Sequence, residues 1–83
     1  MSETKENLNL DSVMQRCFNV VNIIAPSTEI DENVKGWLDD LDFVEIVMET
    51  EKEFDCIIEE GDKRISDFNT IRDLVKWLSS NVA

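Results

Sequence analysis

The sequence predicts an all-α fold. Apolar residues recur at three- and four-residue spacing in three stretches of the chain, as they do along one face of a helix. Asp39 and Thr70, two residues able to cap helices, precede two of these stretches. No long stretch alternates with the period of two that is typical of strands, and no internal repeat is visible, so we expect helices only.

The first predicted helix covers residues 8–24, and residues 1–7 are expected to form a frayed tail outside a folded domain at 8–80. Pro26 should end this helix, because proline lacks a backbone donor and keeps Ala25 out of the helical region. The apolar face of the helix consists of Leu10, Val13, Met14, Cys17, Val20, Val21 and Ile24.

Residues 25–38 form a long connection for so small a domain. We expect this connection to be an ordered loop, with room for one short turn of helix. The apolar side chains that should anchor it to the core are Ile30, Val34, Trp37 and Leu38.

The second predicted helix covers about 40–54. Asp39 offers a side-chain oxygen to cap it, and Asp40 and Asp42 place negative charge in its first turn, where the helix dipole favours it. Its expected core face consists of Phe43, Ile46, Val47, Thr50 and Phe54.

A second apolar row lies on the same helix, rotated away from the core face. It consists of Leu41, Val44 and Met48, and the acidic residues beside it are Asp42, Glu45, Glu49 and Glu51. In so small a bundle little is left to cover this row, so it predicts a protein-docking surface. The alternative is that Leu41 and Val44 close against the 25–38 loop and that the carboxylates form an ordinary solvated face.

The last part of the chain should contain one long helix. We expect at most one or two helical turns between residues 58 and 66, because this segment is short and contains Gly61. The sequence TIRD at 70–73 resembles a capping box. It opens a helix that should end near Ser79, with a core face of Ile71, Leu74, Val75 and Leu78.

The net charge narrows the range of binding partners. The chain has 19 acidic and 8 basic residues, a net charge of -11, and residues 39–62 contain eleven of the acids but only one base, Lys52. Such a surface repels nucleic acids and anionic membranes and attracts proteins with basic patches. No apolar run is long enough for a membrane helix, and the N-terminus lacks the features of a secretory signal, so we expect a cytoplasmic location. We also expect a monomer.

The residue types present argue against an enzyme and against a metal site. The chain has no histidine or tyrosine, no glycine-rich phosphate loop and no visible pair of nucleophile and base. Cys17 and Cys56 fit no zinc pattern; a disulfide between them is open, but we favour Cys17 as a small core residue. A calcium loop needs glycine at its sixth position, whereas the sixth residue of the stretch 39–50 is Val44.

Two stretches resemble the acyl carrier protein family. DDLDFVEIVMETEKEFD, at 39–55, is similar to the family's Asp-Ser-Leu stretch and the acidic helix that follows it, and FNTIRDLVKWL, at 68–78, is similar to the family's last helix. The resemblance covers about residues 8–80. It implies an antiparallel four-helix bundle with a short third helix, which carries acyl chains on a 4'-phosphopantetheine arm attached to the serine of Asp-Ser-Leu.

The resemblance also implies which residues face partner enzymes such as synthases, reductases and the phosphopantetheinyl transferase. These are Asp39, Leu41, Asp42, Val44, Glu45, Met48 and Glu51, which coincide with the second apolar row and its acids. The chain departs from the family at Trp37, where a glycine is usual, at Lys52, where an acid is expected, and at 58–60, where Ile-Glu-Glu replaces Ile-Pro-Asp.

The main departure is Asp40, which stands at the position of the family's attachment serine. Attachment of the arm requires a hydroxyl, so we expect no cofactor on this chain as written. Three explanations remain open: an engineered serine-to-aspartate change, a natural carrier-like paralogue without an arm, or a lapsed carrier that prefers aspartate at a helix start. The sequence therefore predicts an unmodified carrier-like protein of fatty acid or polyketide synthesis, with a non-carrier interaction or regulatory module as the alternative.

Overall fold

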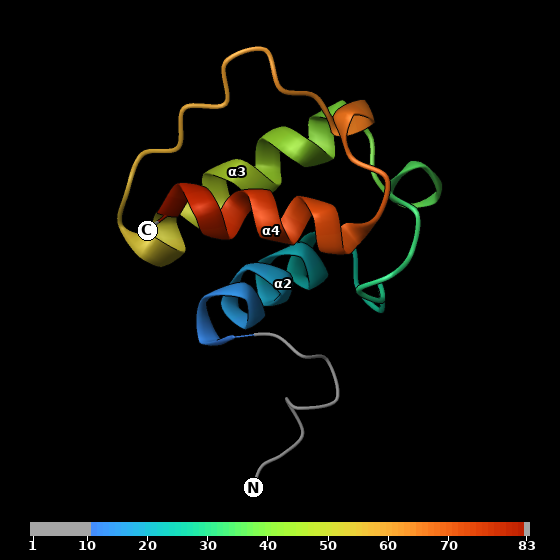
Figure 1. Ribbon diagram of the computed structural model, residues 1–83, viewed down its shortest axis with the longest axis horizontal. Helices are drawn as coiled ribbons and strands as arrows, with labels where there is room; N and C mark the ends of the chain where they lie inside the picture. The colour runs from blue at the N-terminus through green and yellow to red at the C-terminus, as the bar shows by residue number, and fades with distance from the viewer. Residues whose placement is uncertain (1–10, 83) are drawn as a thin grey trace, which may run out of the picture.

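The computed structural model describes residues 11–82, and within them the chain is all-helical. The described residues form no strand. Figure 1 shows α4 lying between α2 and α3, and each of these helices contacts the other two. The elements in order are α2 (Ser12–Ile24), the 3-10 turn η1 (Val34–Gly36), α3 (Asp40–Phe54), the 3-10 turn η2 (Ile65–Asp67) and α4 (Ile71–Val82). The predicted fold class, all-α, is confirmed, whereas a bundle of four helices is not.

Helix α2 begins at Ser12 because Asp11 caps it, with Asp11 Oδ1 accepting a hydrogen bond from the Met14 N–H at 2.8 Å. The predicted start near residue 8, the tail at 1–7 and Leu10 lie outside the described residues. The end at Ile24 is as predicted. Among the predicted core positions Cys17, Val20 and Val21 are buried, and Phe18, which the sequence analysis did not include, is buried beside them.

The connection between α2 and α3 is ordered, as predicted. Ile30, Val34 and Leu38 are buried and anchor it to the core. Its backbone also satisfies the start of α4, since the Ile30 carbonyl accepts from the Arg72 N–H at 2.6 Å and the Glu32 carbonyl accepts from the Ile71 N–H at 2.9 Å. These bonds matter because the first N–H groups of a helix have no partner within it.

Trp37 is not an anchor of this loop, so that prediction was wrong. Its side chain is 44% exposed, and its indole Nε1 donates a hydrogen bond to Glu32 Oε1 at 2.5 Å. A tryptophan has a polar N–H as well as a large apolar ring, and here the N–H finds its partner at the surface.

The segment after α3 contains one helical turn, within the limit of one or two turns predicted from the sequence, and this turn is the 3-10 turn η2. Residues 58–64 are irregular, and the single turn η2 follows them. Gly61 has a φ of 58°, a left-handed conformation that suits glycine and interrupts a helix, and the Lys63 N–H donates to the Glu60 carbonyl in a tight turn. The described residues therefore contain three α-helices, with a 3-10 turn where a third of four helices was expected.

Helix α4 begins with the predicted capping box. Thr70 Oγ1 accepts from the Asp73 N–H, and Asp73 Oδ2 accepts from the Thr70 N–H, each at 3.2 Å. The predicted core face is buried: Ile71, Leu74, Val75 and Leu78. The helix continues three residues beyond the predicted end at Ser79, to Val82.

Three aromatic rings meet in the core between α3 and α4. The ring centroids of Phe43, Phe68 and Trp77 lie 5.6 to 5.9 Å from one another, and all three pairs are tilted. Such tilted pairs add to the stability that area burial provides. Phe43 thus packs the start of α3 against the core, next to the candidate site.

Candidate functional site: the exposed face of α3

The start of α3 is held by two carboxylates that cap each other's backbone. Asp39 Oδ1 accepts from the Asp42 N–H at 2.9 Å, and Asp42 Oδ2 accepts from the Asp39 N–H at 3.1 Å. The helix begins at Asp40 and ends at Phe54, as predicted. Asp39 and Asp42 thus have a structural role besides the docking role that the resemblance implies.

Helix α3 has one buried face and one exposed apolar row. On the buried face lie Phe43, Ile46, Val47 and Thr50, with Phe54 at the edge of the core. Thr50 Oγ1 donates to the Ile46 carbonyl at 2.7 Å, so the buried hydroxyl has a partner.

The second apolar row is exposed in the structure. Leu41 is 76% exposed, Val44 44% and Met48 53%, so these side chains do not close against the 25–38 loop. Single exposed apolar residues are common, but three in one row on one helix leave an apolar strip that is largely open to solvent.

The acidic residues beside this row differ in what they contact. Glu45 is exposed and makes no hydrogen bond or ion pair with the described residues. Glu49 forms a 3.4 Å ion pair with Lys52 on the same helix. Glu51 is engaged, because its Oε2 accepts from the Ile58 N–H at 2.8 Å. Among the predicted docking acids, Glu45 is therefore the one whose charge is fully available to a partner.

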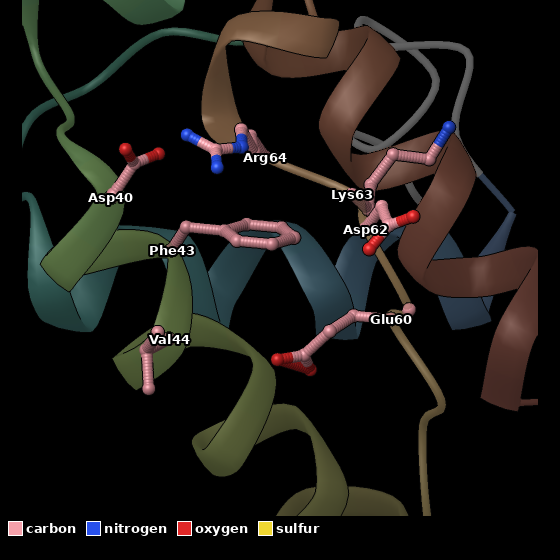
Figure 2. A pocket seen from close by; sticks show the side chains of 8 residues that line it. Asp40, Phe43, Val44, Glu60, Asp62, Lys63 and Arg64 are labelled. Atoms are coloured by element: carbon pink, nitrogen blue, oxygen red, sulfur yellow. The ribbon is translucent and has the colours of Figure 1, made fainter.

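Asp40 is exposed at the first position of α3 and borders a hollow. Its Oδ1 accepts a hydrogen bond from the Ile65 N–H at 3.3 Å. Figure 2 shows the Arg64 guanidinium extending toward the Asp40 carboxylate, with the Phe43 ring below them. The hollow is open to solvent, has a volume of about 440 Å³ and is lined by Asp40, Phe43, Val44, Glu60, Gly61, Asp62, Lys63 and Arg64.

The hollow itself was not predicted from the sequence. Asp40 was predicted only as part of the first turn of the helix, and Lys63 and Arg64, the two consecutive cations that line the hollow with it, were not singled out. Their signal was present, since they directly follow the segment that contains eleven acids and one base. Lys63 Nζ lies 5.8 Å from the centroid of the Phe68 ring, within the range of a cation–π contact.

The side chains at the hollow limit the chemistry it can perform. No hydroxyl or thiol lines it, and the carboxylates of Asp40, Glu60 and Asp62 are the groups able to accept a proton. Within residues 11–82 no three carboxylate or thiol side chains are grouped closely enough to hold a metal ion. The arrangement suits the binding of a charged surface.

The two cysteines lie away from this hollow, and both are free thiols. Cys17 is buried in α2, and burial raises the pKa of its thiol to about 11. Cys56 is half-buried and packs against the edge of the core. The interpretation of Cys17 as a small core residue is confirmed.

Comparison of the chain with models of protein families, with curated proteins and with solved structures found no match. Across residues 11–82, none of the helices has both the length and the apolar character that crossing a membrane requires.

Proposed function

We propose that this chain is an acyl-carrier-protein-like module that docks on basic-surfaced enzymes of acyl-chain synthesis through α3, and that it does so without a phosphopantetheine arm. The observation that carries the proposal is the exposed row of Leu41, Val44 and Met48 beside unengaged negative charge at Glu45. Apolar side chains supply the desolvation energy of an interface, and the charges guide a cationic partner toward it. The module is proposed to work as a monomer in the cytoplasm.

The same proposal includes a carrier-like arrangement of the helices. The three α-helices, the long anchored loop before α3 and the single turn η2 are compatible with a small bundle in which η2 takes the place of a short third helix. In such a bundle Asp40 occupies the position of the attachment serine. Its carboxylate offers no hydroxyl to form the phosphodiester, so the arm is absent for a chemical reason.

A second candidate function is an interaction or regulatory module unconnected with acyl transfer. The observation in its favour is the hydrogen bond between Asp40 Oδ1 and the Ile65 N–H, which gives Asp40 a structural use of its own. On this alternative the aspartate belongs to the fold, and the docking face serves another kind of basic protein.

The experiment that separates the two compares the original chain with Asp40→Ser and Asp40→Ala. Each protein is incubated with coenzyme A and a broad-specificity phosphopantetheinyl transferase, and its intact mass is measured. We expect the arm to be added to the serine form alone. If all three proteins remain unmodified while the serine form is folded, the carrier proposal is wrong and the interaction module is favoured.

The docking face is tested in the Asp40→Ser background. Glu45→Lys reverses a charge on the proposed surface, and Glu29→Lys reverses an exposed charge in the loop before α3. We expect Glu45→Lys to slow modification by the transferase and Glu29→Lys to leave the rate close to that of Asp40→Ser. Equal slowing by both would show that net charge, and not the α3 face, governs docking.

A further inference from the structure

The segment that follows α3 runs back along that helix. Residues 55–65, here called the strap, leave the C-terminal end of α3 and return toward its N-terminal end, where η2 begins (Figure 1). Over residues 56–64 the strap contains no helix. Its position therefore depends on contacts with the rest of the chain.

Each end of the strap is attached to α3 in the same way. Near one end Ile58 is buried, and its backbone N–H donates to Glu51 Oε2 at 2.8 Å. At the other end Ile65 is buried, and its backbone N–H donates to Asp40 Oδ1 at 3.3 Å. At both ends, therefore, a buried isoleucine is combined with a hydrogen bond from its own N–H to a carboxylate of α3.

The middle of the strap contributes little to holding it in place. Residues 59–64 are exposed or half-buried. They form a tight turn around the left-handed Gly61, closed by the hydrogen bond from the Lys63 N–H to the Glu60 carbonyl, so this bond lies within the strap and does not tie it to α3. The hollow lies between this part and α3, and Figure 2 shows the Phe43 ring extending from α3 toward the strap residues that line it. The strap thus covers part of α3 while contacting the core chiefly at its two ends.

We propose that the strap is a hinged cover, fastened to α3 by Glu51 and Asp40, which lifts while the three α-helices remain folded. Lifting removes two hydrogen bonds and partly withdraws two isoleucines, whereas unfolding the helices would expose the whole core. Local openings that break few contacts occur far more often than global unfolding. Lifting uncovers Phe43, whose ring belongs to the cluster with Phe68 and Trp77. Lifting of the strap requires neither docking nor an arm.

Amide hydrogen exchange followed by NMR tests this on the unmodified chain. We expect the amides of Ile58 and Ile65 to exchange at least roughly tenfold faster than those of Leu74 and Val75, the buried residues of α4. Equal protection at the four amides would overturn the proposal, because the strap would then open only when the whole protein unfolds.

Two substitutions test the fasteners against a matched control. Glu51→Ala removes the acceptor of the Ile58 N–H, and Glu45→Ala removes a carboxylate from the same helix that makes no hydrogen bond. We expect Glu51→Ala to speed exchange at Ile58 by roughly fivefold to tenfold, the effect of losing one hydrogen bond, with no change at Leu74. Equal effects of Glu51→Ala and Glu45→Ala at Ile58 would overturn the role of Glu51.

The same measurement is repeated at the other end with Asp40→Ala and Asp40→Asn. The asparagine retains an acceptor oxygen, so we expect it to protect the Ile65 amide better than alanine does. Because lifting breaks both hydrogen bonds together, Asp40→Ala should also speed exchange at Ile58, while Leu74 remains unchanged. If Asp40→Ala leaves exchange at Ile65 unaltered, Asp40 is not a fastener and the proposed two-ended attachment is wrong.

Discussion

Asp39 and Asp42 cap each other at the start of α3, each carboxylate accepting a hydrogen bond from the other's backbone N–H. Two acids in such proximity would ordinarily repel one another. Here both carboxylates accept bonds from N–H groups that have no partner within the helix, at the positive end of the helix dipole, which favours negative charge. The first turn of the docking face is therefore fixed by residues that are themselves part of the acidic surface.

Removal of this cap should destabilise the protein. We expect Asp39→Ala to lower the free energy of unfolding by about 1 kcal/mol, because the Asp42 N–H loses its acceptor. Urea unfolding followed by tryptophan fluorescence measures the change. Glu45→Ala, on the same helix but without a hydrogen bond, is the control and should change the stability by less than about 0.5 kcal/mol. Equal losses would show that the cap is not the cause.

Much of α3 could be predicted because the relevant signals are local. The cap at Asp39, the bounds 40–54 and the two apolar rows all depend on spacing along one helix, and the structure confirms them. The end of α4 was placed too early at Ser79 for a local reason as well. Ser79, Ser80 and Asn81 are polar, but their side chains donate hydrogen bonds to carbonyls of the preceding turn, and the helix continues to Val82.

The features that the sequence analysis missed depend on the path of the chain in space. The bond from Ile65 to Asp40 joins residues 25 positions apart, and its formation requires the strap to return along α3. Trp37 lies in an irregular loop, where no periodicity indicates which way a side chain points. The position of η2 could not be predicted for the same reason. No helical pattern marks this segment, and its Ile65 is buried in the core.

Arg16 connects α2 to the end of α3 and should contribute modestly to stability. Its Nε donates to Glu53 Oε2 at 2.9 Å, its Nη2 donates to the Glu53 carbonyl at 3.0 Å, and its guanidinium lies 4.2 Å from the centroid of the Phe54 ring. The ion pair is about half exposed, so solvent weakens it. We expect Arg16→Ala to lower the free energy of unfolding by about 0.5–1 kcal/mol.

Two further variants assign this effect to the guanidinium. Arg16→Lys keeps the charge but not the forked geometry, and we expect it to recover only part of the loss. Lys35→Ala removes an exposed cation that makes no ion pair within residues 11–82, so the stability should hardly change. If Lys35→Ala destabilises the protein as much as Arg16→Ala, net charge and not the contact with Glu53 and Phe54 explains the result.

The acidic surface should make the protein more stable in salt. Residues 39–62 contain eleven acids and one base, and the ion pairs that compensate them in the described chain are Arg16–Glu53 and Lys52–Glu49. Salt screens the remaining repulsion, so we expect the melting temperature to rise with sodium chloride and with magnesium. A rise of about 4–8 °C would correspond to roughly 1 kcal/mol. Glu45→Gln removes one uncompensated charge and should give a smaller rise, and a flat response of the original chain would contradict the prediction.

The two thiols should react at different rates. Burial raises the pKa of the Cys17 thiol to about 11, and the thiolate is the reactive form, so Cys17 should be protected at pH 8. Cys56 is half-buried and should be alkylated first. We expect iodoacetamide to add one label rapidly to the native protein and the second only after urea is added, as followed by intact mass. Cys56→Ser should take up no rapid label, and equal rates at the two thiols would show that Cys17 is more accessible than its burial indicates.

The contact between Asp31 and Arg72 should make stability depend on acid pH. The hydrogen bond from Arg72 Nε, 3.0 Å from Asp31 Oδ1, holds the pKa of the Asp31 carboxyl below its ordinary value. A carboxyl whose pKa is lower in the folded state contributes stability above its unfolded pKa, and that contribution disappears as the pH falls through the folded pKa. Asp31→Asn should therefore be less stable than the original chain near neutral pH, and the difference should vanish under acid conditions. Urea unfolding between pH 7 and pH 2 measures it; a difference that stays constant over this range would show that the asparagine acts through packing or geometry and not through the lost charge.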